Sequence, residues 1–439
     1  MSDHNEGKVA ISGIRSFNGE LRVPGDKSIS HRALLISALS SGVSQILGLS
    51  SGKDVQATRA VISRLGAKVN VEGDHITVEG GRRLLKPPDE ILDVGNSGTL
   101  IRLAAGMVAG LGGRYSFTGD ESVNRRPMAR IFKPLTEMGA KIEASGSGDT
   151  APFTITSHGL NGIRYEMPIA SAQVKSAILF AGLGARGTTT VVEHVPTRRH
   201  TEEMLGDAGA LIEVEKLEDR SEIRIERGDL HPVDYDIPGD PSQAAFWLVA
   251  ALITPNSQVT VRNIYLGDLR SDFISVLERM GGDLEIIRKS QNSGDVTARS
   301  SNLNATEISP KEIPGIIDEI PILSVAAVCA SGTTTISGAA ELRVKESDRI
   351  SVMTEALRSF GAKVDEFPDG MAITRGGQLH SGKVSAHLDH RIAMASSILG
   401  AAVEGETEVL GFDSVASSYP NFVSDLLSLM SSNDASSRP

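Results

Sequence analysis

One pattern recurs six times in this chain, about every 70 to 75 residues: a polar cluster, an apolar helix rich in small residues, and a strand bounded by glycine. The apolar stretches are residues 32–48, 99–119, 176–193, 244–263, 323–338 and 392–411. The polar clusters just upstream are Lys27-Ser28, Asn96-Ser97-Gly98, Ser171-Ala172-Gln173, Asp240-Pro241-Ser242, Asp318-Glu319 and Asp389-His390-Arg391. Because a helix N-terminus offers free N–H groups and the positive end of its dipole, the repeat predicts a site for a negatively charged ligand.

A second helix follows each strand, and most of these helices end in a glycine that introduces a hairpin, as in SRLGAKVNVEGDHITVEG and RSFGAKVDEFPDGMAITRG. Glycine can close a helix in the left-handed conformation, and the alternating Val and Ile positions predict a half-buried antiparallel pair. One unit is therefore strand, helix, strand, helix, strand, strand. The sixth unit stops after a helix at 422–430, so we expect strands at 8–14 and 19–24 to complete it.

The length of 439 residues predicts two domains of about 200 residues each. We place units one to three in a domain at 23–238 and units four to six in a domain made of 1–22 and 239–430, followed by a polar tail at 431–439. The chain would cross twice between the domains, which favours hinged closure over a ligand. A solenoid is the alternative for a repetitive chain, but the polar positions repeat in place and differ in kind, which indicates a diversified site.

The composition excludes several classes of function. A net charge of −11 and a pI near 5.5 argue against a general nucleic-acid or anionic-membrane binder, although basic clusters such as Arg125-Arg126 and Arg198-Arg199 stand out locally. The apolar runs are shorter than a membrane-spanning helix, and the first residues do not resemble a signal peptide. The single cysteine, Cys329, excludes an intrachain disulfide and is expected to be a buried structural thiol. We therefore expect a cytoplasmic protein.

Three segments of the first domain are candidate anion sites. Lys27 and Ser28 precede a helix and Arg32 follows one turn later, which suits a phosphate site or an ordinary capped helix, without the spacing of a Walker A loop. The small residues at 96–98 expose backbone N–H groups to a ligand or simply form a tight turn. Arg126 directly before Pro127 suits the first turn of a helix, where its fork could bind a carboxylate or phosphate.

The second domain adds cations and carboxylates. Lys345 and Arg349 are spaced i, i+4, as on one face of a helix, with Glu346 one residue round as a proton donor or acceptor; a surface ion-pair helix is the alternative. Asp318 could cap a helix or act as a general base. His390 and Arg391 follow another histidine at i−3, but no third ligand is near, and we expect no metal and no cofactor.

The segments LRVPGDKSISHRALL, GNSGTLIRL, RRPM, SAQVKSA, DEIPIL, LRVKESDRI and DHRIAM occur in this order between about residues 20 and 425. Together they resemble the motif set of the 5-enolpyruvylshikimate-3-phosphate synthases. The resemblance implies an α/β fold that is a two-domain inside-out α/β barrel, with three βαβαββ repeats per domain and helix N-termini facing a cleft between the domains. It also implies transfer of the enolpyruvyl group of phosphoenolpyruvate to the 5-hydroxyl of shikimate 3-phosphate, with release of phosphate, on the route to chorismate and the aromatic amino acids.

The resemblance assigns roles to individual residues. Those implied to bind shikimate 3-phosphate are Lys27, Ser28, Arg32, Ser171, Ala172, Gln173, Arg198, Asp318 and Lys345. Those implied to bind phosphoenolpyruvate are Lys27, Asn96, Gly98, Arg126, Gln173, Arg349 and Arg391. Asp318 is implied to accept the proton of the 5-hydroxyl, and Glu346 with Lys27 to protonate the methylene carbon. The partners are then two small anions, and we expect a monomer that binds neither nucleic acid nor membrane.

Two positions depart from the family pattern. Ala172 stands where some members have a second serine, and Ser417 stands nearest to where many have a lysine. Both departures resemble the branch that includes glyphosate-tolerant enzymes, whereas Gly98 leaves room where some tolerant members have alanine, so tolerance is left open. The rival is the sister enolpyruvyl transferase that acts on UDP-N-acetylglucosamine, which commonly has a loop cysteine that this first domain lacks. A non-catalytic anion-binding scaffold would not need the carboxylates Asp318 and Glu346.

Overall fold

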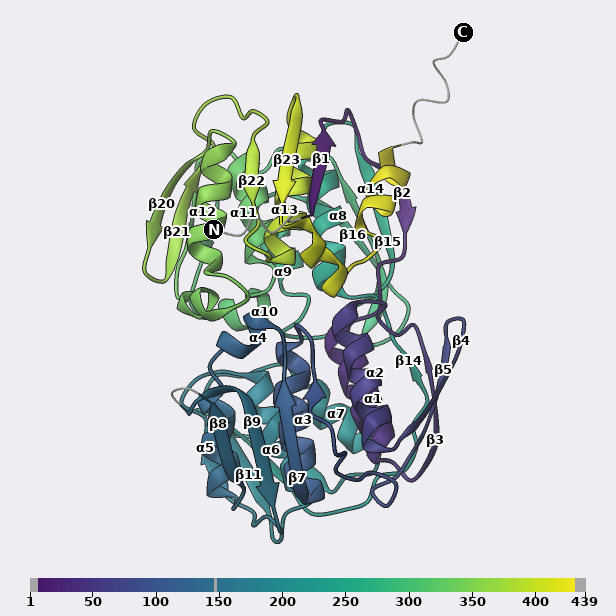
Figure 1. Ribbon diagram of the computed structural model, residues 1–439. Coiled ribbons are helices and arrows are strands. Elements are labelled where there is room, and N and C mark those ends of the chain that lie inside the picture. The colour runs from purple at the N-terminus through teal and green to yellow at the C-terminus, as the bar shows by residue number, and fades with distance from the viewer. Residues whose placement is uncertain (1–6, 146–147, 431–439) are drawn as a thin grey trace. The chain divides into compact units, whose positions relative to one another are not determined.

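The computed structural model describes residues 7–145 and 148–430 and divides the chain into two compact units (Figure 1). The inserted unit is residues 25–237; the terminal unit combines residues 1–24 with 238–439. The chain therefore passes from one unit to the other at Pro24–Gly25 and returns at Ile237–Pro238. The polar tail predicted at 431–439 lies outside the described residues.

Six long helices form the interiors of the units, three in each, and they coincide with the six apolar stretches of the sequence. They are α1 (Lys27–Leu39), α3 (Gly98–Leu111) and α6 (Ala172–Gly182) in the inserted unit, and α8 (Pro241–Ile253), α11 (Ile320–Cys329) and α13 (His390–Ala402) in the terminal unit. All residues of α8 but the last are buried. A helix that is apolar around its circumference must be enclosed by protein, and in each unit the sheets lie outside these helices (Figure 1).

Small residues let the interior helices approach one another closely. A Cβ atom on Gly106 of α3 would lie 2.1 Å from the carbonyl oxygen of Ala177 in α6, so this contact requires glycine. The predicted fold class, an inside-out α/β barrel in each of two units, is confirmed.

The described residues contain five four-stranded sheets and one three-stranded sheet. The strands of the inserted unit are β3 (Gly42–Leu47), β4 (Lys68–Glu72), β5 (His75–Gly80), β6 (Leu92–Asp93), β7 (Gly113–Thr118), β8 (Lys141–Ser145), β9 (Thr150–Ser157), β10 (Arg164–Glu166), β11 (Thr189–Glu193), β12 (Ile212–Lys216), β13 (Ser221–Ile225) and β14 (Tyr235–Asp236). Those of the terminal unit are β1 (Lys8–Ser12), β2 (Asn18–Leu21), β15 (Gln258–Tyr265), β16 (Asp283–Arg288), β17 (Ser293–Arg299), β18 (Glu307–Ile308), β19 (Thr333–Ile336), β20 (Lys363–Phe367), β21 (Gly370–Thr374), β22 (Lys383–Ser385) and β23 (Glu406–Leu410).

Each four-stranded sheet repeats one arrangement, for example β6-β7-β9-β8 and β18-β19-β21-β20. The first strand runs parallel to the second, and the remaining neighbours are antiparallel. The five predicted hairpins are present as β4-β5, β8-β9, β12-β13, β16-β17 and β20-β21. The glycines before them, Gly66, Gly139, Gly209, Gly281 and Gly361, all have positive φ, as predicted for residues that close helices.

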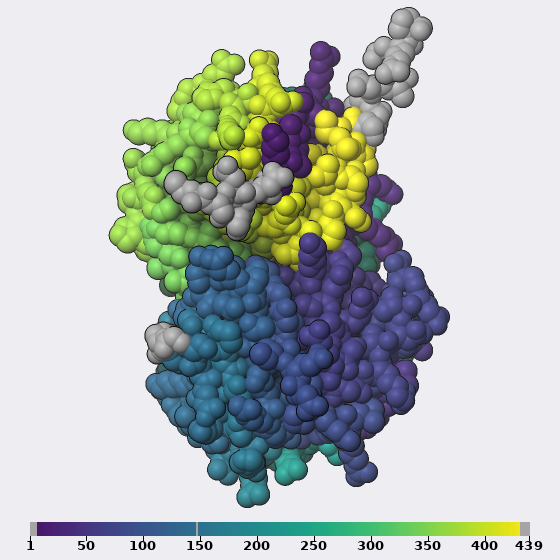
Figure 2. Space-filling model, viewed as in Figure 1, coloured from purple at the N-terminus to yellow at the C-terminus, as the bar shows by residue number. Residues whose placement is uncertain are grey.

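We predicted that both N-terminal strands complete the sixth sequence repeat, and this prediction is wrong for one of them. β1 does pair with β23, Lys8 opposite Leu410, in the three-stranded sheet β1-β23-β22. In Figure 2, purple N-terminal and yellow C-terminal residues accordingly lie side by side on the surface of the terminal unit. β2, however, runs parallel to β15 as the first strand of the fourth sheet. Between the two strands Phe17 is fully buried and its N–H donates to Ser257, which directs the chain toward β15.

The first sheet obtains its first strand in the same way from a distant segment. β14, just before the chain leaves the inserted unit, runs parallel to β3 with Tyr235 opposite Ile46. At each passage, the chain forms a short strand of the unit that it is about to leave: β2 before Pro24–Gly25 and β14 before Ile237–Pro238.

Apart from α2 and α12, the remaining helices of the described residues are shorter than the six interior helices. These remaining helices are α2 (Lys53–Leu65), α4 (Glu121–Arg125), α5 (Ala129–Glu137), α7 (His200–Asp207), α9 (Phe273–Arg279), α10 (Ile313–Ile316), α12 (Arg349–Ser359) and α14 (Phe422–Met430), with 3₁₀ turns η1 (Ala340–Val344) and η2 (Phe412–Ser417). Trp247 of α8 stacks on Phe422 of α14 with ring centroids 4.9 Å apart, so the last helix packs on the terminal unit's core. Across residues 7–145 and 148–430, no helix combines the length and hydropathy needed to span a membrane.

Candidate active site

The polar clusters identified in the sequence stand at the N-termini of the six interior helices. Asp26, Ser97 and Ser171 cap α1, α3 and α6, and each accepts a hydrogen bond from a backbone N–H of the first turn. Asp240 and Asp389 do the same for α8 and α13. Glu319 occupies this position before α11 without such a bond. These caps start the helices slightly earlier than predicted: Lys27 and Ser28 lie in the first turn of α1, and His390 and Arg391 in that of α13, rather than upstream. The polar groups are still concentrated at the N-terminal ends of the helices.

In the inserted unit, the cations of α1 are held by neighbouring helices. The Lys27 ammonium lies 3.0 Å from a carboxylate oxygen of Asp54 in α2. Arg32 is buried, and its guanidinium donates to the Ser28 carbonyl at 2.9 Å, to Ser176 of α6 at 2.8 Å and to Thr201 of α7 at 2.6 Å. Arg32 thus joins α1, α6 and α7; predicted ligands lie on α1 and α6 and just before α7.

The loop before α3 lies against two arginines. Arg126 donates to the Asn96 side chain at 3.3 Å and to Ser122 at 3.0 Å. A Cβ atom on Gly98 would lie 2.6 Å from Nη1 of Arg126 and 2.9 Å from Nη1 of Arg102. Two guanidinium groups therefore meet at the positive end of a helix dipole, which favours an anion there. The sequence reasoning missed Arg102, although its i, i+4 spacing from Gly98 was a usable signal.

The prediction that Arg126 and Pro127 stand in the first turn of a helix is wrong. Arg126 is the C-terminal cap of α4 in an extended conformation, and α5 begins only at Ala129. Asp120 starts α4 by accepting from the N–H of Val123, so the helix forms before the proline and the chain turns at it.

Ser171, Ala172 and Gln173 stand at the start of α6. Gln173 donates to Thr99 of α3 at 3.0 Å, which ties the start of α6 to that of α3 within the same unit. Arg198 is partly buried just before α7. The structure thus gathers the predicted ligands of this unit on α1, α3, α6 and the segments before α5 and α7.

The sequence reasoning also missed a buried ion cluster beneath these residues. Lys175 of α6 is fully buried, 2.6 Å from a carboxylate oxygen of Glu202 in α7 and 3.1 Å from one of Glu193 in β11. It also donates to the Thr197 carbonyl at 3.4 Å. The sequence offered little indication that Lys175 is buried, because lysines in helices are usually exposed on the surface.

In the terminal unit, two arginines lie next to Asp318. Arg349, only 1% exposed, lies 3.6 Å from an Asp318 carboxylate oxygen, 2.6 Å from Glu346 and 2.8 Å from Asp389. Arg391 donates to the Asp318 backbone carbonyl at 2.9 Å, and its guanidinium lies 3.9 Å from the Asp318 carboxylate. Two arginines and two candidate proton-transfer carboxylates thus form one cluster.

The helical spacing predicted for Lys345 and Arg349 is wrong. Lys345 follows the 3₁₀ turn η1, and α12 begins at Arg349 behind the cap Asp348. Lys345 and Glu346 therefore lie in the loop before α12. Asp348 accepts from the N–H of Ser351, which starts the helix four residues later than the i, i+4 interpretation requires.

Burial and neighbouring charges shift the pKa values in this cluster. Burial lowers the pKa of the Lys345 ammonium, and nearby Arg349 lowers it further, while Asp318 opposes both. Burial also disfavours the charge on Arg349, but the carboxylates of Asp389 and Glu346 outweigh it and raise the pKa of the guanidinium. Arg349 is thus a fixed cation.

Ser417 and Cys329, which the sequence analysis singled out, both lie at the ends of helical segments. Ser417, where the family pattern has a lysine, ends η2 and is buried. Cys329 is partly buried at the end of α11, and burial raises the pKa of its thiol to about 12, in keeping with a structural thiol.

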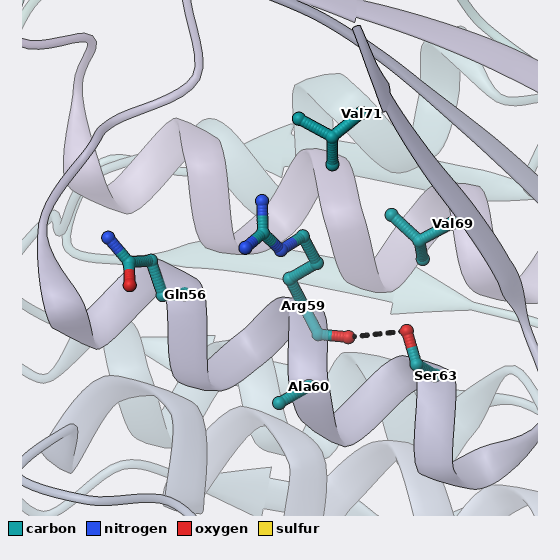
Figure 3. Close-up of a pocket in the computed structure, with 6 residues that line it drawn as sticks. All are labelled: Gln56, Arg59, Ala60, Ser63, Val69 and Val71. Carbon is teal, nitrogen blue, oxygen red and sulfur yellow. Dashed lines mark hydrogen bonds between the residues drawn. The ribbon is translucent and has the colours of Figure 1, made fainter.

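Figure 3 shows a groove on the inserted unit. It runs between α2 and β4 and is lined by Gln56, Arg59, Ala60, Ser63, Val69 and Val71. None of the predicted ligands or catalytic residues lines it, so it is not the candidate site.

The chain is similar to known proteins along almost its whole length. The family model of EPSP synthase (3-phosphoshikimate 1-carboxyvinyltransferase) matches residues 11–426. The 3-phosphoshikimate 1-carboxyvinyltransferase of Synechococcus sp. (strain RCC307) is 43% identical, covering 97% of this chain and 100% of its own. That of Halorhodospira halophila is 46% identical, covering 95% and 94%.

Solved structures agree with the sequence comparisons. The EPSP synthase of Acinetobacter baumannii superimposes with a TM-score of 0.84 at 37% identity, covering 96% of this chain and 98% of its own. The enolpyruvyl transferase NikO of Streptomyces tendae superimposes with a TM-score of 0.78 at 18% identity over 97% of this chain, and thus shares the fold.

Proposed function

Because this chain belongs to the EPSP synthase family, we propose that it transfers the enolpyruvyl group of phosphoenolpyruvate to the 5-hydroxyl of shikimate 3-phosphate and releases phosphate. The observation that carries the proposal is the cluster of Asp318, Glu346, Arg349 and Arg391, which combines fixed cations with two carboxylates. Joining two anions requires cations to offset their repulsion, and proton transfer requires groups that accept and donate protons.

We assign the binding roles unit by unit. In the inserted unit, Ser28, Arg32, Ser171, Ala172, Gln173 and Arg198 hold shikimate 3-phosphate, and Asn96, Gly98 and Arg126, with Gln173, hold phosphoenolpyruvate. Lys27 serves both. In the terminal unit, Arg349 and Arg391 hold phosphoenolpyruvate, and Lys345 with Asp318 holds shikimate 3-phosphate. The buried state of Arg349 supports its role, because a guanidinium in a low-dielectric site interacts strongly with an anion.

The chemistry proceeds by addition and elimination. Asp318 accepts the proton of the 5-hydroxyl as that oxygen forms a bond to C2 of phosphoenolpyruvate. Glu346, with Lys27, delivers a proton to the methylene carbon, which becomes a methyl group in a tetrahedral intermediate. Loss of a proton from that methyl group and departure of phosphate then restore the double bond in the product. No cofactor takes part in the proposed reaction.

The direct test is release of phosphate from phosphoenolpyruvate by the purified protein. We expect release only when shikimate 3-phosphate is present, with no turnover on UDP-N-acetylglucosamine, the substrate of the alternative transferase. The fluorescent or colorimetric phosphate signal should be matched by disappearance of phosphoenolpyruvate. Turnover with the UDP-sugar but not with shikimate 3-phosphate would contradict the assignment. Failure to turn over either acceptor would contradict it as well.

Replacing Gly98 with alanine is expected to weaken phosphoenolpyruvate binding selectively. The new Cβ atom would meet the guanidinium groups of Arg126 and Arg102, which must move away from the anion site. We expect KM for phosphoenolpyruvate to rise about tenfold, equivalent to about 1.4 kcal/mol, with KM for shikimate 3-phosphate changed less than about twofold. Gly228→Ala is the matched control in the same unit, because a Cβ atom there meets nothing within 4 Å. Equal changes in both KM values would count against the assigned anion site.

A further inference from the structure

A second buried arginine in the terminal unit connects the starts of two interior helices. Arg270 lies in the loop between β15 and α9 and is 1% exposed. Its guanidinium donates to Asp240 at 2.5 Å and to Ser242 at 2.5 Å, and it lies 3.2 Å from a carboxylate oxygen of Glu319. Ser242 in turn donates to Glu319. Asp240 and Ser242 start α8 and Glu319 starts α11, so Arg270 ties the two N-termini together.

The loop that carries Arg270 is itself held in a constrained conformation. Leu269 has a φ of +57°, in the left-handed region that a branched side chain rarely adopts. Its N–H donates to Asp272 at 3.1 Å. Asp272 packs so closely on α10 that a Cβ atom on Gly315 would lie 2.3 Å from its carboxylate. Surrounding structure therefore holds the loop in a conformation that the sequence would not favour alone, as is common where geometry matters for function.

The residue next to Glu319 is Asp318, the assigned base. Arg391 donates to the backbone carbonyl of Asp318, and Arg270 contacts the side chain of Glu319, so two arginines hold two consecutive residues. These arginines come from different elements, α13 and the loop before α9. The segment from which the Asp318 carboxylate projects is thereby held by both.

We propose that Arg270 is a positioning residue for the reaction: through Glu319 it fixes the segment that presents Asp318 to the 5-hydroxyl. This inference rests on the proposed function. A buried ion cluster is not needed for stability, because well-packed apolar residues often serve as well, but its directional bonds define one geometry. Base catalysis depends on such geometry, since a misplacement of about 1 Å can cost about a hundredfold in rate.

Arg270→Lys tests the proposal, because lysine keeps the charge and loses the planar fork that reaches Asp240 and Ser242 together. We expect kcat to fall about 30-fold, with both KM values changed less than about threefold. Arg262→Lys is the control: Arg262 of β15 also joins two carboxylates, Glu20 and Asp295, in the same unit but lies outside the assigned site. It should leave kcat unchanged. The emission of Trp247, on α8, reports whether each variant retains the packed core.

A double-mutant cycle separates positioning from a general loss of structure. If Arg270 acts through Asp318, Arg270→Lys should lower kcat less than about threefold in a protein that already carries Asp318→Asn. Should Arg270→Lys fold poorly, Glu319→Gln offers the same cycle, because it keeps the shape of the side chain and weakens the bond to Arg270.

The outcomes divide clearly. A large loss of kcat in the wild-type background that nearly vanishes in the Asp318→Asn background supports the proposal. An unchanged kcat for Arg270→Lys overturns the positioning proposal and leaves the proposed function intact. A fall in kcat by the same factor in the wild-type and Asp318→Asn backgrounds does the same. Absence of turnover in the wild-type protein would refute the proposed function and this inference with it.

Discussion

Asp318→Asn is expected to lower kcat about a thousandfold while the protein still binds both substrates. A positioned general base typically contributes between about a hundredfold and ten-thousandfold, and asparagine cannot accept the proton of the 5-hydroxyl. Binding should persist because Arg391 holds the backbone carbonyl of residue 318, a contact that the substitution leaves in place. The measurement is steady-state phosphate release together with calorimetric titration of shikimate 3-phosphate.

The control for this variant is Asp365→Asn, on the exposed strand β20 of the same unit, which should retain the wild-type rate. A turnover number for Asp318→Asn within about tenfold of the wild-type value would remove Asp318 from the role of base. A loss of shikimate 3-phosphate binding equal to the loss of rate would instead limit Asp318 to its proposed binding role.

Lys175→Met is expected to destabilise the inserted unit strongly. The substitution leaves the carboxylates of Glu193 and Glu202, each no more than 4% exposed, without the cation between them. Breaking a buried ion pair by removing one partner typically costs about 3–5 kcal/mol, a large part of the 5–15 kcal/mol that stabilises a typical protein. The cost arises because a buried carboxylate must stay charged without compensation or take up a proton.

Hydrogen exchange followed by mass spectrometry measures this effect unit by unit. Peptides from α6, β11 and α7 should lose protection in Lys175→Met, and the midpoint of urea unfolding should fall. Lys141→Met is the matched control, because Lys141 forms a solvent-exposed pair with Glu143 in the same unit. It should leave both measurements unchanged. Unchanged protection of α6 in Lys175→Met would show that the cluster adds no net stability.

Much of the fold could be predicted because its signals are local. The helix caps at Asp26, Ser97 and Ser171 follow from side chains that accept N–H bonds within three residues. The same holds for Gly66, which closes α2 in the left-handed conformation. Where two local signals competed, prediction was wrong: Pro127 favours a helix start, but Asp120 begins α4 earlier and leaves Arg126 as its last cap.

The candidate site could be predicted only as a set of residue types and positions. The assigned roles of Lys27, Asp318 and Glu346 stay predictions from the family resemblance. The sequence could not show that Lys175 and Arg270 are buried cations, because each meets its carboxylates only after distant segments pack together. The same limit applies to Arg102, whose contact with Gly98 becomes significant only beside Arg126.

The sixfold repeat, the six interior helices, their N-terminal caps and the five hairpins were determined by the sequence alone, because each depends on residues a few positions apart. The tertiary structure decided which sheet each strand joins. β2 belongs with β15, and β14 with β3, because parallel partners are chosen by long-range burial such as that of Phe17. It also decided which charges meet: Arg349 with Asp389 and Arg270 with Asp240 pair across more than twenty residues, and no local rule specifies such a partner.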